Sequence, residues 1–356
     1  VRRGRDRLTG GYVATTTLDV NWRQRGAKQG PEMRPVTHPI AILYEHPLWF
    51  NPLFTELDRR GVQYRPVDVS DDRADLHEAL EGCGLVVNRM SPSAWARGNG
   101  PAIGRTQELL RRLEADGVPV INAARAFEYE TSKIRQLELL AQLGVDHPKG
   151  RPFSNPSEAV EAAAGLRFPV LVKPNLGGSG AGIRSFDDPD ELKAATLSGD
   201  LENLSYDGLA LVQEHLPAEG DSIVRIEILD GDHLYAIRLR LLPGSFNLCP
   251  ADYCDLPGVA DGVSGRGLPV EAFTPPEDVI ETAKKIIGAA EMDLGGVEYL
   301  VDSRDGRPYF YDVNALSNFV ADAPNVIGFD PFVDLASFIV RRAQDIEGAM
   351  AGQPVR

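Results

Sequence analysis

The chain has 356 residues, of which 43% are apolar and 25% charged, with a formal net charge of -15. This length is enough for two or three domains with buried cores, and the acidic balance argues against a nucleic-acid partner, because phosphate neutralisation needs a basic face. We expect a cytoplasmic protein without membrane contact, since the sequence shows neither an 18-residue apolar run nor a signal-peptide pattern. The odd number of cysteines predicts no disulfide framework, and their spacing predicts no metal site: Cys83, Cys249 and Cys254.

The first predicted segments are an N-terminal extension and an α/β domain. Residues 1–35 lack apolar periodicity and are expected to form a flexible extension. Strand and helix patterns then alternate over residues 36–124, which predicts a parallel sheet with crossover helices. The expected strands cover 40–45, 62–69, 84–89 and 118–122, and the expected helices cover 52–61 and the later part of 96–117.

Two further domains and a tail are predicted downstream. A helix begins at Thr131 or Ser132 and ends at Gly144, and it opens a small lid domain over residues 125–212. That domain continues with helix 156–165, strand 168–174, a glycine-rich turn, strand 182–186, helix 188–196 and strand 210–216. Residues 213–345 are expected to form a larger antiparallel sheet, with residues 346–356 as a tail. Its expected strands are 222–231, 233–242, 295–303 and 308–314, with a helix over 278–290.

A glycine-rich turn follows a buried strand near the middle of the chain. The apolar run FPVLV leads into Lys173, and four glycines follow, namely Gly177, Gly178, Gly180 and Gly182. Glycine allows backbone N–H groups to converge on phosphate oxygens without obstruction by side chains. A phosphate-binding loop and a plain hairpin turn both stay open at this point, because the pattern matches neither the Walker nor the dinucleotide motif.

Two carboxylates and an amide stand on the last two predicted strands. Glu298 lies on one strand, and Asp312 and Asn314 lie two residues apart on the other, so the latter two share a face of the sheet. Such oxygen ligands suit a hard cation that also holds nucleotide phosphates. The alternative is a solvated polar face, but apolar neighbours place the acids near a buried wall, where unpaired carboxylates are unfavourable. The pattern therefore favours a metal site.

Taken together, these motifs resemble those of the ATP-grasp superfamily over about residues 36–340. The motifs are ETSKIRQLELLAQLGVDHPK, FPVLVKPNLGGSGAGI and LVQEHLP, followed by the acidic set Glu298, Asp312 and Asn314. NRMSPSA and IRLRLLPGSFNLCPADYC point to the glutathione synthetase and ribosomal-protein glutamate ligase (RimK-like) branch. The resemblance implies an α/β (α+β) ATP-grasp fold, with an N-terminal parallel domain, a small lid and a larger C-terminal antiparallel sheet.

The resemblance implies phosphate contacts from two lysines and the glycine loop. Lys133 and Lys173 would contact the nucleotide phosphates, and the loop with Gly178, Ser179 and Gly180 would close over the β and γ phosphates. Without the resemblance, Lys133 would be interpreted as a lysine on a helix surface. The metal ligands implied are Glu298, Asp312 and Asn314, which would bind two Mg²⁺ ions, with Mn²⁺ as an alternative.

The adenosine contacts implied by the resemblance come from the hinge between the lid and the large domain. Gln213 and Glu214 belong to this set, and Glu214, with the backbone near His215 and Leu216, would contact the adenine. Asp221 would hold the ribose hydroxyls. An arginine usually stabilises the acyl phosphate in such sites, and the predicted strands offer three candidates: Arg240, Arg238 and Arg225.

The implied activity is that of an ATP-dependent carboxylate–amine ligase in biosynthesis, which forms an acyl phosphate and releases ADP and phosphate. Its partners would be a small-molecule carboxylate, such as an amino acid or small peptide, and an amine. The chain departs from the branch pattern at Ser245 and Phe246, where an arginine is often found, and lacks the proline expected after Asn314. It departs from the D-alanine:D-alanine ligase pattern at Gly296, where that branch has arginine. The loop over 243–267 is the predicted acceptor loop.

Other functions remain as alternatives. A carboxylase-type ATP-grasp enzyme would activate bicarbonate, and a non-catalytic protein would bind the nucleotide without turnover. The two acids and two lysines argue against the latter, since binding alone does not need two metals. A dinucleotide-dependent oxidoreductase has only the early strand–helix alternation in its favour, because no G-x-G-x-x-G follows the first strand. A homo-oligomer, dimer or tetramer, is compatible with the sequence.

Overall fold

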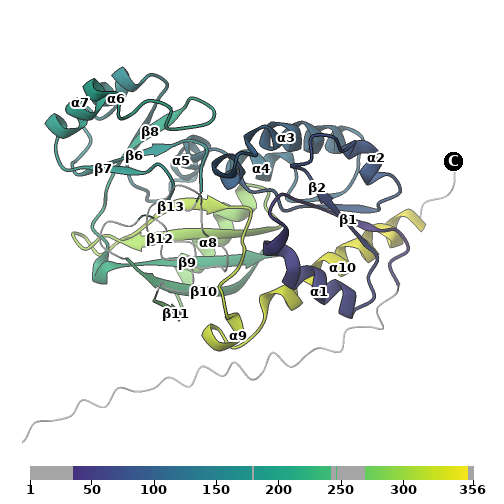
Figure 1. The fold of residues 1–356 in the computed structure, drawn as a ribbon. Helices are drawn as coiled ribbons and strands as arrows, with labels where there is room; N and C mark the ends of the chain where they lie inside the picture. Colours follow the sequence, from purple (N-terminus) through teal and green to yellow (C-terminus); the bar gives the residue numbers. More distant parts are fainter. Residues whose placement is uncertain (1–34, 179, 242–245, 247–268, 352–356) are drawn as a thin grey trace, which may run out of the picture. The chain divides into compact units, whose positions relative to one another are not determined.

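The computed structural model describes residues 35–178, 180–241, 246 and 269–351 (Figure 1). Residues Val36–Arg356 form one compact unit. The predicted acceptor loop, apart from Phe246, lies outside the described residues. No helix in the described ranges is both long and apolar enough to span a bilayer.

The first sheet is parallel, as its alternating strands and helices predict. Its strand order is β2-β1-β3-β4. Ile40 and Ile42 of β1 pack into one hydrophobic cluster, and Ala41 and Leu43 pack into another on the opposite face. Because both faces are covered, the strand is a continuous apolar run. The elements are β1 (Ile40–Tyr44), α1 (Asn51–Arg59), β2 (Tyr64–Asp68), α2 (Leu76–Leu80), β3 (Leu85–Asn88), α3 (Gly100–Ala115), β4 (Val120–Ile121) and α4 (Ala124–Glu130).

The second sheet is antiparallel and belongs to the predicted lid. Its strand order is β5-β8-β6-β7. Val170 and Val172 of β6 belong to a cluster with residues of α6 and α7, whereas Leu171 and Lys173 alternate with them and line a cavity. The strands are β5 (Gly150–Phe153), β6 (Val170–Pro174), β7 (Arg184–Phe186) and β8 (Ala210–Glu214), and the helices are α5 (Lys133–Gln142), α6 (Ala159–Ala162) and α7 (Pro189–Ser198).

The third sheet has five antiparallel strands in the order β11-β10-β9-β12-β13. One of its faces, with Val224, Ile226 and Val297, packs on α8 (Figure 1). The opposite face carries Arg225 and Glu298, which are directly opposed across β9 and β12. The elements are β9 (Ser222–Leu229), β10 (Asp232–Arg240), β11 (Val270–Ala272), α8 (Glu277–Ala289), β12 (Leu294–Val301) and β13 (Pro308–Asn314).

The C-terminal end of the described chain corrects one predicted boundary. Helix α10 (Pro331–Ala351) continues through the border predicted at 345 and 346, so residues 346–351 are helical and not a tail. The helix packs on α1 and contributes Leu335, Ile339 and Val340 to the cluster shared with β1 and β3. Short elements also lacked a prediction: α2, α4, α9 (Ala323–Val326), β5, β11 and the 3-10 turns η2 (Pro47–Phe50), η3 (Pro92–Arg97), η4 (Pro156–Glu158) and η5 (Glu219–Asp221).

Asn122 joins the first sheet to the third. It is 1% exposed and has a φ of 54°, a left-handed conformation that asparagine tolerates better than most residues. Its Oδ1 accepts from the N–H groups of Asp293 (2.8 Å) and Leu294 (3.2 Å). Its Nδ2 donates to the carbonyls of Leu294 and Ala315, at 2.8 Å each. These bonds hold the end of β4 to the start of β12 and the end of β13.

We expect Asn122→Ala to lower the free energy of unfolding by about 3–5 kcal/mol, because it leaves buried backbone groups without partners and because alanine tolerates positive φ less well than asparagine. Asn122→Gly should lose about 1 kcal/mol less, since glycine removes the backbone strain. Chemical denaturation of the three proteins measures both differences. Equal losses in the two variants would show that the left-handed conformation does not contribute.

Candidate functional site

A cavity of about 600 Å³ is lined by all three sheets or the segments that follow them. It brings together predicted residues from segments far apart in the chain. Those in its lining are Lys133, Lys173, Gly178, Gly180, Gln213, Glu214, His215, Leu216, Asp221, Arg225, Glu298, Asp312 and Asn314. Ser179 lies outside the described residues.

Asn175, directly after β6, brings the two predicted lysines to the same wall. Its Oδ1 accepts from Ser132 Oγ and from Ile134 N, at 3.0 Å each, and its carbonyl accepts from Lys133 N at 3.1 Å. These bonds fix the first turn of α5 beside the end of the strand that carries Lys173. A helix N-terminus and two ammonium groups therefore meet at one side of the cavity, where an anion is favoured.

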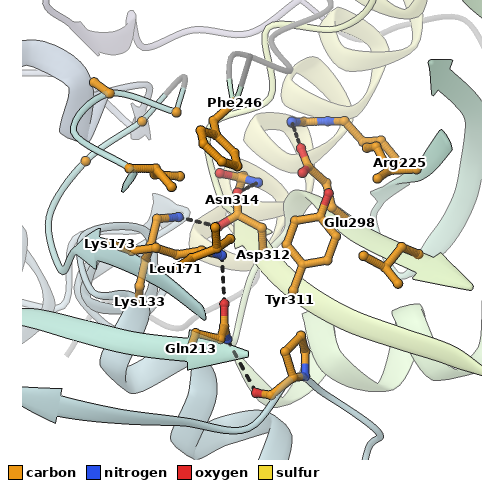
Figure 2. Close-up of a pocket in the computed structure, with 18 of the residues that line it drawn as sticks. Lys133, Leu171, Lys173, Gln213, Arg225, Phe246, Glu298, Tyr311, Asp312 and Asn314 are labelled. Atoms are coloured by element: carbon orange, nitrogen blue, oxygen red, sulfur yellow. Dashed lines mark hydrogen bonds and ion pairs between the residues drawn. The ribbon is translucent and has the colours of Figure 1, made fainter. Parts of the chain in front are cut away.

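The two lysines have different partners (Figure 2). Lys133 forms an ion pair with Asp312, which raises the pKa of the lysine although burial alone would lower it. Lys173 donates to Gln213 Oε1 at 2.7 Å and lies 5.5 Å from the centre of the Tyr311 ring. Burial, followed by repulsion from Lys133, lowers the pKa of Lys173 to about 8. Lys173 thus lacks a carboxylate partner among its described hydrogen bonds and is suited to an incoming anion.

The glycine loop approaches the first domain closely. A Cβ placed on Gly178 would lie 3.2 Å from Ser93 Cβ, which is tighter than most such contacts. Ser93 is buried in η3 and also lines the cavity. Glycine at position 178 therefore allows the loop to lie directly against the first domain, over the wall that carries the lysines.

The acidic side of the cavity is built by strand register. Glu298 on β12 faces Asp312 on β13, and Gly296 faces Asn314, so the three oxygen-bearing side chains share one face. A register shift between Glu298 and Tyr299 leaves Tyr311 as an extra residue on β13. Tyr311 therefore joins Asp312 in the cavity lining, where strict alternation would have turned it away.

The acids differ in their electrostatic environment. Burial, reinforced by the nearby Asp312, raises the pKa of Glu298 above its ordinary value although Arg225 lies beside it. Burial would also raise the pKa of Asp312, but Lys133 and the Asn314 amide, which donates to Asp312 Oδ2 at 3.1 Å, hold it below its ordinary value. Two close carboxylates whose ionisation is mutually unfavourable form a site that gains from added positive charge.

The residues present fit a hard divalent cation. Glu298, Asp312 and Asn314 supply carboxylate and amide oxygens from adjacent strands, which are the donors that Mg²⁺ prefers. No group of three or more His, Cys, Asp or Glu side chains with metal-site geometry occurs in the described part of the chain. Two protein carboxylates leave positions for other oxygen ligands, so the set suits a metal that is shared with a ligand rather than one enclosed by protein.

Glu214, the last residue of β8, and His215, which follows it, both line the cavity. The Glu214 carboxylate accepts from Arg167 N at 3.0 Å and lies 3.8 Å from the Arg167 guanidinium. Its backbone N–H donates to Lys149 O, and that of His215 donates to Pro169 O. Burial lowers the pKa of His215, with a further contribution from Lys173, so its imidazole is predominantly neutral at pH 7.

The three predicted arginines separate in the structure. Arg225 is buried in the cavity lining, where Nη1 donates to Glu298 Oε1 at 3.1 Å (Figure 2). Arg238 instead pairs with Glu271 at 3.3 Å, and its guanidinium lies 3.9 Å from the centre of the Phe273 ring. Arg240 is exposed and, like Arg238, is absent from the lining. The structure therefore corrects the placement of Arg238 and Arg240 in the site, because their face of β10 points away from the cavity.

Several residues of the lining were not found from the sequence. Glu130 is buried, and its Oε2 accepts from the N–H groups of Ala315 and Leu316. Burial raises its pKa to about 7, and Asp312 adds to this shift. Trp49 and Ser93 come from the first domain. Ser93 belongs to the segment NRMSPSA, which contributed to the family resemblance. No sequence pattern marks Glu130 or Trp49 as residues of a site.

Comparisons with known proteins agree with this architecture. Residues 132–213 match the model of the ATP-binding domain of the carbamoyl-phosphate synthase L chain. A carbamoyl phosphate synthase large chain from Clostridium beijerinckii is 27% identical over 212 residues, which cover 58% of this chain and 18% of that protein. The chain thus spans less than a fifth of this relative's length.

Solved structures resemble nearly the whole described fold. D-alanine–D-alanine ligase from Bacillus anthracis, complexed with ATP, has a TM-score of 0.62 at 16% identity, with 88% of this chain and 99% of that chain covered. A RimK domain ATP-grasp protein from Sphaerobacter thermophilus has a TM-score of 0.58 at 18% identity, with 84% and 99% covered. The fold and the cavity define a three-part ATP-grasp architecture. These likenesses show the ATP-grasp fold, and membership of the superfamily or of one of its branches stays a prediction.

We expect binding of ADP at pH 8, without divalent ions, to take up about half a proton at Lys173, because a nearby phosphate raises the pKa of a lysine that is half protonated at that pH. Lys173→Arg stays charged at this pH and should take up correspondingly less. Calorimetry in two buffers with different ionisation enthalpies measures the difference. The same proton uptake in both proteins would show that the proton is not taken up at Lys173.

Proposed function

We propose that the protein is an ATP-dependent carboxylate–amine ligase that releases ADP and phosphate. The observation that supports this most strongly is the meeting of two lysines and a glycine loop with two carboxylates and an amide in one cavity. These groups come from α5, β6, β12 and β13, so the constellation depends on the whole fold. Such an arrangement suits a polyphosphate that lies between cations on one side and metal ligands on the other.

The adenosine end of the nucleotide is proposed to lie at the hinge. Leu171 and Leu216 are apolar members of the lining there, and Gln213 holds Lys173 in place. Asp221 also lines the cavity and is proposed to hold the ribose hydroxyls. The triphosphate would then extend along the wall of Lys133 and Lys173.

The metal site is proposed to use the three acidic-face residues. Mg²⁺, when bound, would neutralise charge on the phosphate oxygens, with two ions as the predicted number and Mn²⁺ as an alternative. Glu298, Asp312 and Asn314 would hold it, and Lys133 would then exchange its contact with Asp312 for a phosphate oxygen. Arg225, paired with Glu298, lies on the far side of these acids from Lys133 (Figure 2).

The proposed reaction needs no nucleophile from the protein. A substrate carboxylate oxygen forms a bond to the γ-phosphorus, the bond between that phosphorus and the bridging oxygen breaks, and ADP leaves. An amine nitrogen then bonds to the acyl carbon, the bond to the phosphate oxygen breaks, and phosphate and a proton are released. Lys133, Lys173 and Arg225 supply positive charge where negative charge collects, and the buried cavity strengthens these interactions.

Residues from the first domain and from the segment after β13 line the proposed substrate end. Trp49, Leu316 and Phe319 are buried there, and Ser93 adds a hydroxyl. Arg225 is the one cation among the described residues that line this end, and it is already paired with two carboxylates. Arg97 contacts Ser93 and the Trp49 ring from outside the lining and is paired with Glu45. We therefore propose that the substrate carries an uncharged side chain.

A bicarbonate-activating enzyme is a second candidate, because the matching family model and one relative are carbamoyl-phosphate synthases. Its first step would use the same phosphoryl transfer to a carboxylate oxygen. Stimulation of ADP release by bicarbonate, in the absence of any other carboxylate, would favour this reading over the amino-acid or peptide ligase.

We expect Lys173→Ala and Asp312→Ala to lower ADP release from ATP by on the order of 100-fold or more, because each removes a charge that acts on the transferring phosphoryl group. Near- and far-UV circular dichroism should show an unchanged fold. Release of AMP and pyrophosphate by the wild type would contradict the acyl-phosphate scheme, and full activity in either variant would remove that residue from the site.

We expect amino acids with uncharged side chains to support ADP release at least about tenfold better, in kcat/KM, than glutamate or aspartate. Trp49→Ala should lower kcat/KM for the best acid by a further factor of about 10 to 200, because it removes apolar contact area. Leu48→Ala is the matched control, since Leu48 is 44% exposed and absent from the lining. Preference for glutamate would contradict the proposed substrate class.

A further inference from the structure

Arg225 is the arginine of the cavity lining, and its guanidinium is held by neighbours on two strands. Nε donates to Glu227 Oε1 at 2.6 Å, and Nη1 donates to Glu298 Oε1 at 3.1 Å. No described residue accepts a hydrogen bond from Nη2. The guanidinium is therefore fixed on two sides and keeps one donor nitrogen for a ligand.

Glu227 is shielded from solvent, and the one described hydrogen bond of its side chain is with Arg225. It is 0% exposed, and its Oε2 lacks a partner among the described residues. A fully buried carboxylate is unfavourable unless it is paired, and the ion pair with Arg225 is the described contact that offsets its burial, with the buried Arg89 as a further nearby cation. When Glu298 takes part in metal binding, Glu227 is the group that still holds the guanidinium.

Gly296 provides the space that the guanidinium occupies. Gly296 lies opposite Glu227 across β9 and β12, two pairs along from Glu298 and Arg225 and on the same face of the sheet. A Cβ at position 296 would lie 2.8 Å from Arg225 Nη2, 2.9 Å from Nε and 3.0 Å from Cζ. Carbon atoms do not approach this closely, so any side chain at this position would displace the guanidinium.

We infer that Glu227 and Gly296 are positioning residues that hold the Arg225 guanidinium at the substrate end of the cavity for the acyl-phosphate chemistry. The chemical role given to Arg225 rests on the proposed ligase function, whereas the geometry of its guanidinium does not. Neither residue needs to touch the substrate. Glu227 orients the guanidinium by charge and hydrogen bonding. Gly296 lets the guanidinium lie close to the backbone of β12, because glycine has no side chain there.

The adjacent glycine gives a matched control. Gly295 lies on the opposite face of β12, where a Cβ would lie 2.6 Å from Ile287 Cδ1 and 3.1 Å from both Met292 Sδ and Asn314 O. Alanine at 295 therefore disturbs the core beneath the sheet, whereas alanine at 296 disturbs the arginine above it. The two variants add the same methyl group to neighbouring residues of one strand.

We expect Gly296→Ala to lower kcat for ADP release by about 100-fold, the loss typical for one oxyanion-stabilising group, with KM for ATP unchanged within about twofold. The assay uses ATP, Mg²⁺ and a mixture of the standard amino acids. Gly295→Ala should lower the melting temperature more than Gly296→Ala while keeping most of kcat. Equal losses of kcat in the two variants, or wild-type kcat in Gly296→Ala, would overturn the inference.

A double-mutant cycle distinguishes positioning from a general structural effect. If Gly296 and Glu227 act through the guanidinium, Arg225→Met should abolish their contribution. Gly296→Ala and Glu227→Gln should then each change kcat by less than about twofold in the Arg225→Met background, although each lowers it in the wild-type background. Additive losses would show that the two residues act independently of Arg225.

The geometry is also tested without turnover. In a crystal structure of Gly296→Ala, the guanidinium should have moved away from Glu227, and an unmoved guanidinium would overturn the inference even if the variant is inactive. Absence of ADP release from the wild type with any acid, including bicarbonate, would instead contradict the proposed function. The experiments therefore distinguish a wrong positioning role for Gly296 and Glu227 from a wrong proposed function.

Discussion

Balance among buried charges on one face of the five-stranded sheet is the constraint on which the site depends. Arg225, Glu227 and Glu298 are each less than a tenth exposed, and a buried charge without a partner costs several kcal/mol. Strand register solves this by setting Arg225 opposite Glu298, while Lys133 reaches Asp312 from α5. The lid and the sheet are therefore joined by the ion pair between Lys133 and Asp312, which is the contact that the proposed nucleotide and its metal would replace.

Much of the architecture could be predicted because its signals are local. Continuous apolar runs alternating with helical periodicity indicated the parallel sheet, and both faces of β1 are buried as that pattern requires. Asp312 and Asn314 could be placed on one face from their spacing alone, since side chains alternate along a strand. Glu298 was grouped with them from its own strand, but its direct pairing with Asp312 could not be predicted, because pairing between strands leaves no local trace in the sequence.

Other features could not be predicted because they depend on tertiary register or on distant contacts. The register shift beside Glu298 places Tyr311 in the lining, and nothing in PYFYDVN marks the extra residue. The Glu130 carboxylate accepts hydrogen bonds from the N–H groups of Ala315 and Leu316, which lie more than 180 residues further along the chain. Helix α10 was missed as an element, and its contact with α1 links the two ends of the described chain.

Gly296 illustrates how a comparison by aligned position can mislead. The D-alanine:D-alanine ligase pattern has an arginine there, so the glycine is a departure from that branch. The structure fills the space above Gly296 with the guanidinium of Arg225, which reaches it from the neighbouring strand. A positive charge at one point of a sheet can come from either of two adjacent strands, provided that the other strand leaves room. The glycine is therefore evidence of where the arginine lies, and not of its loss.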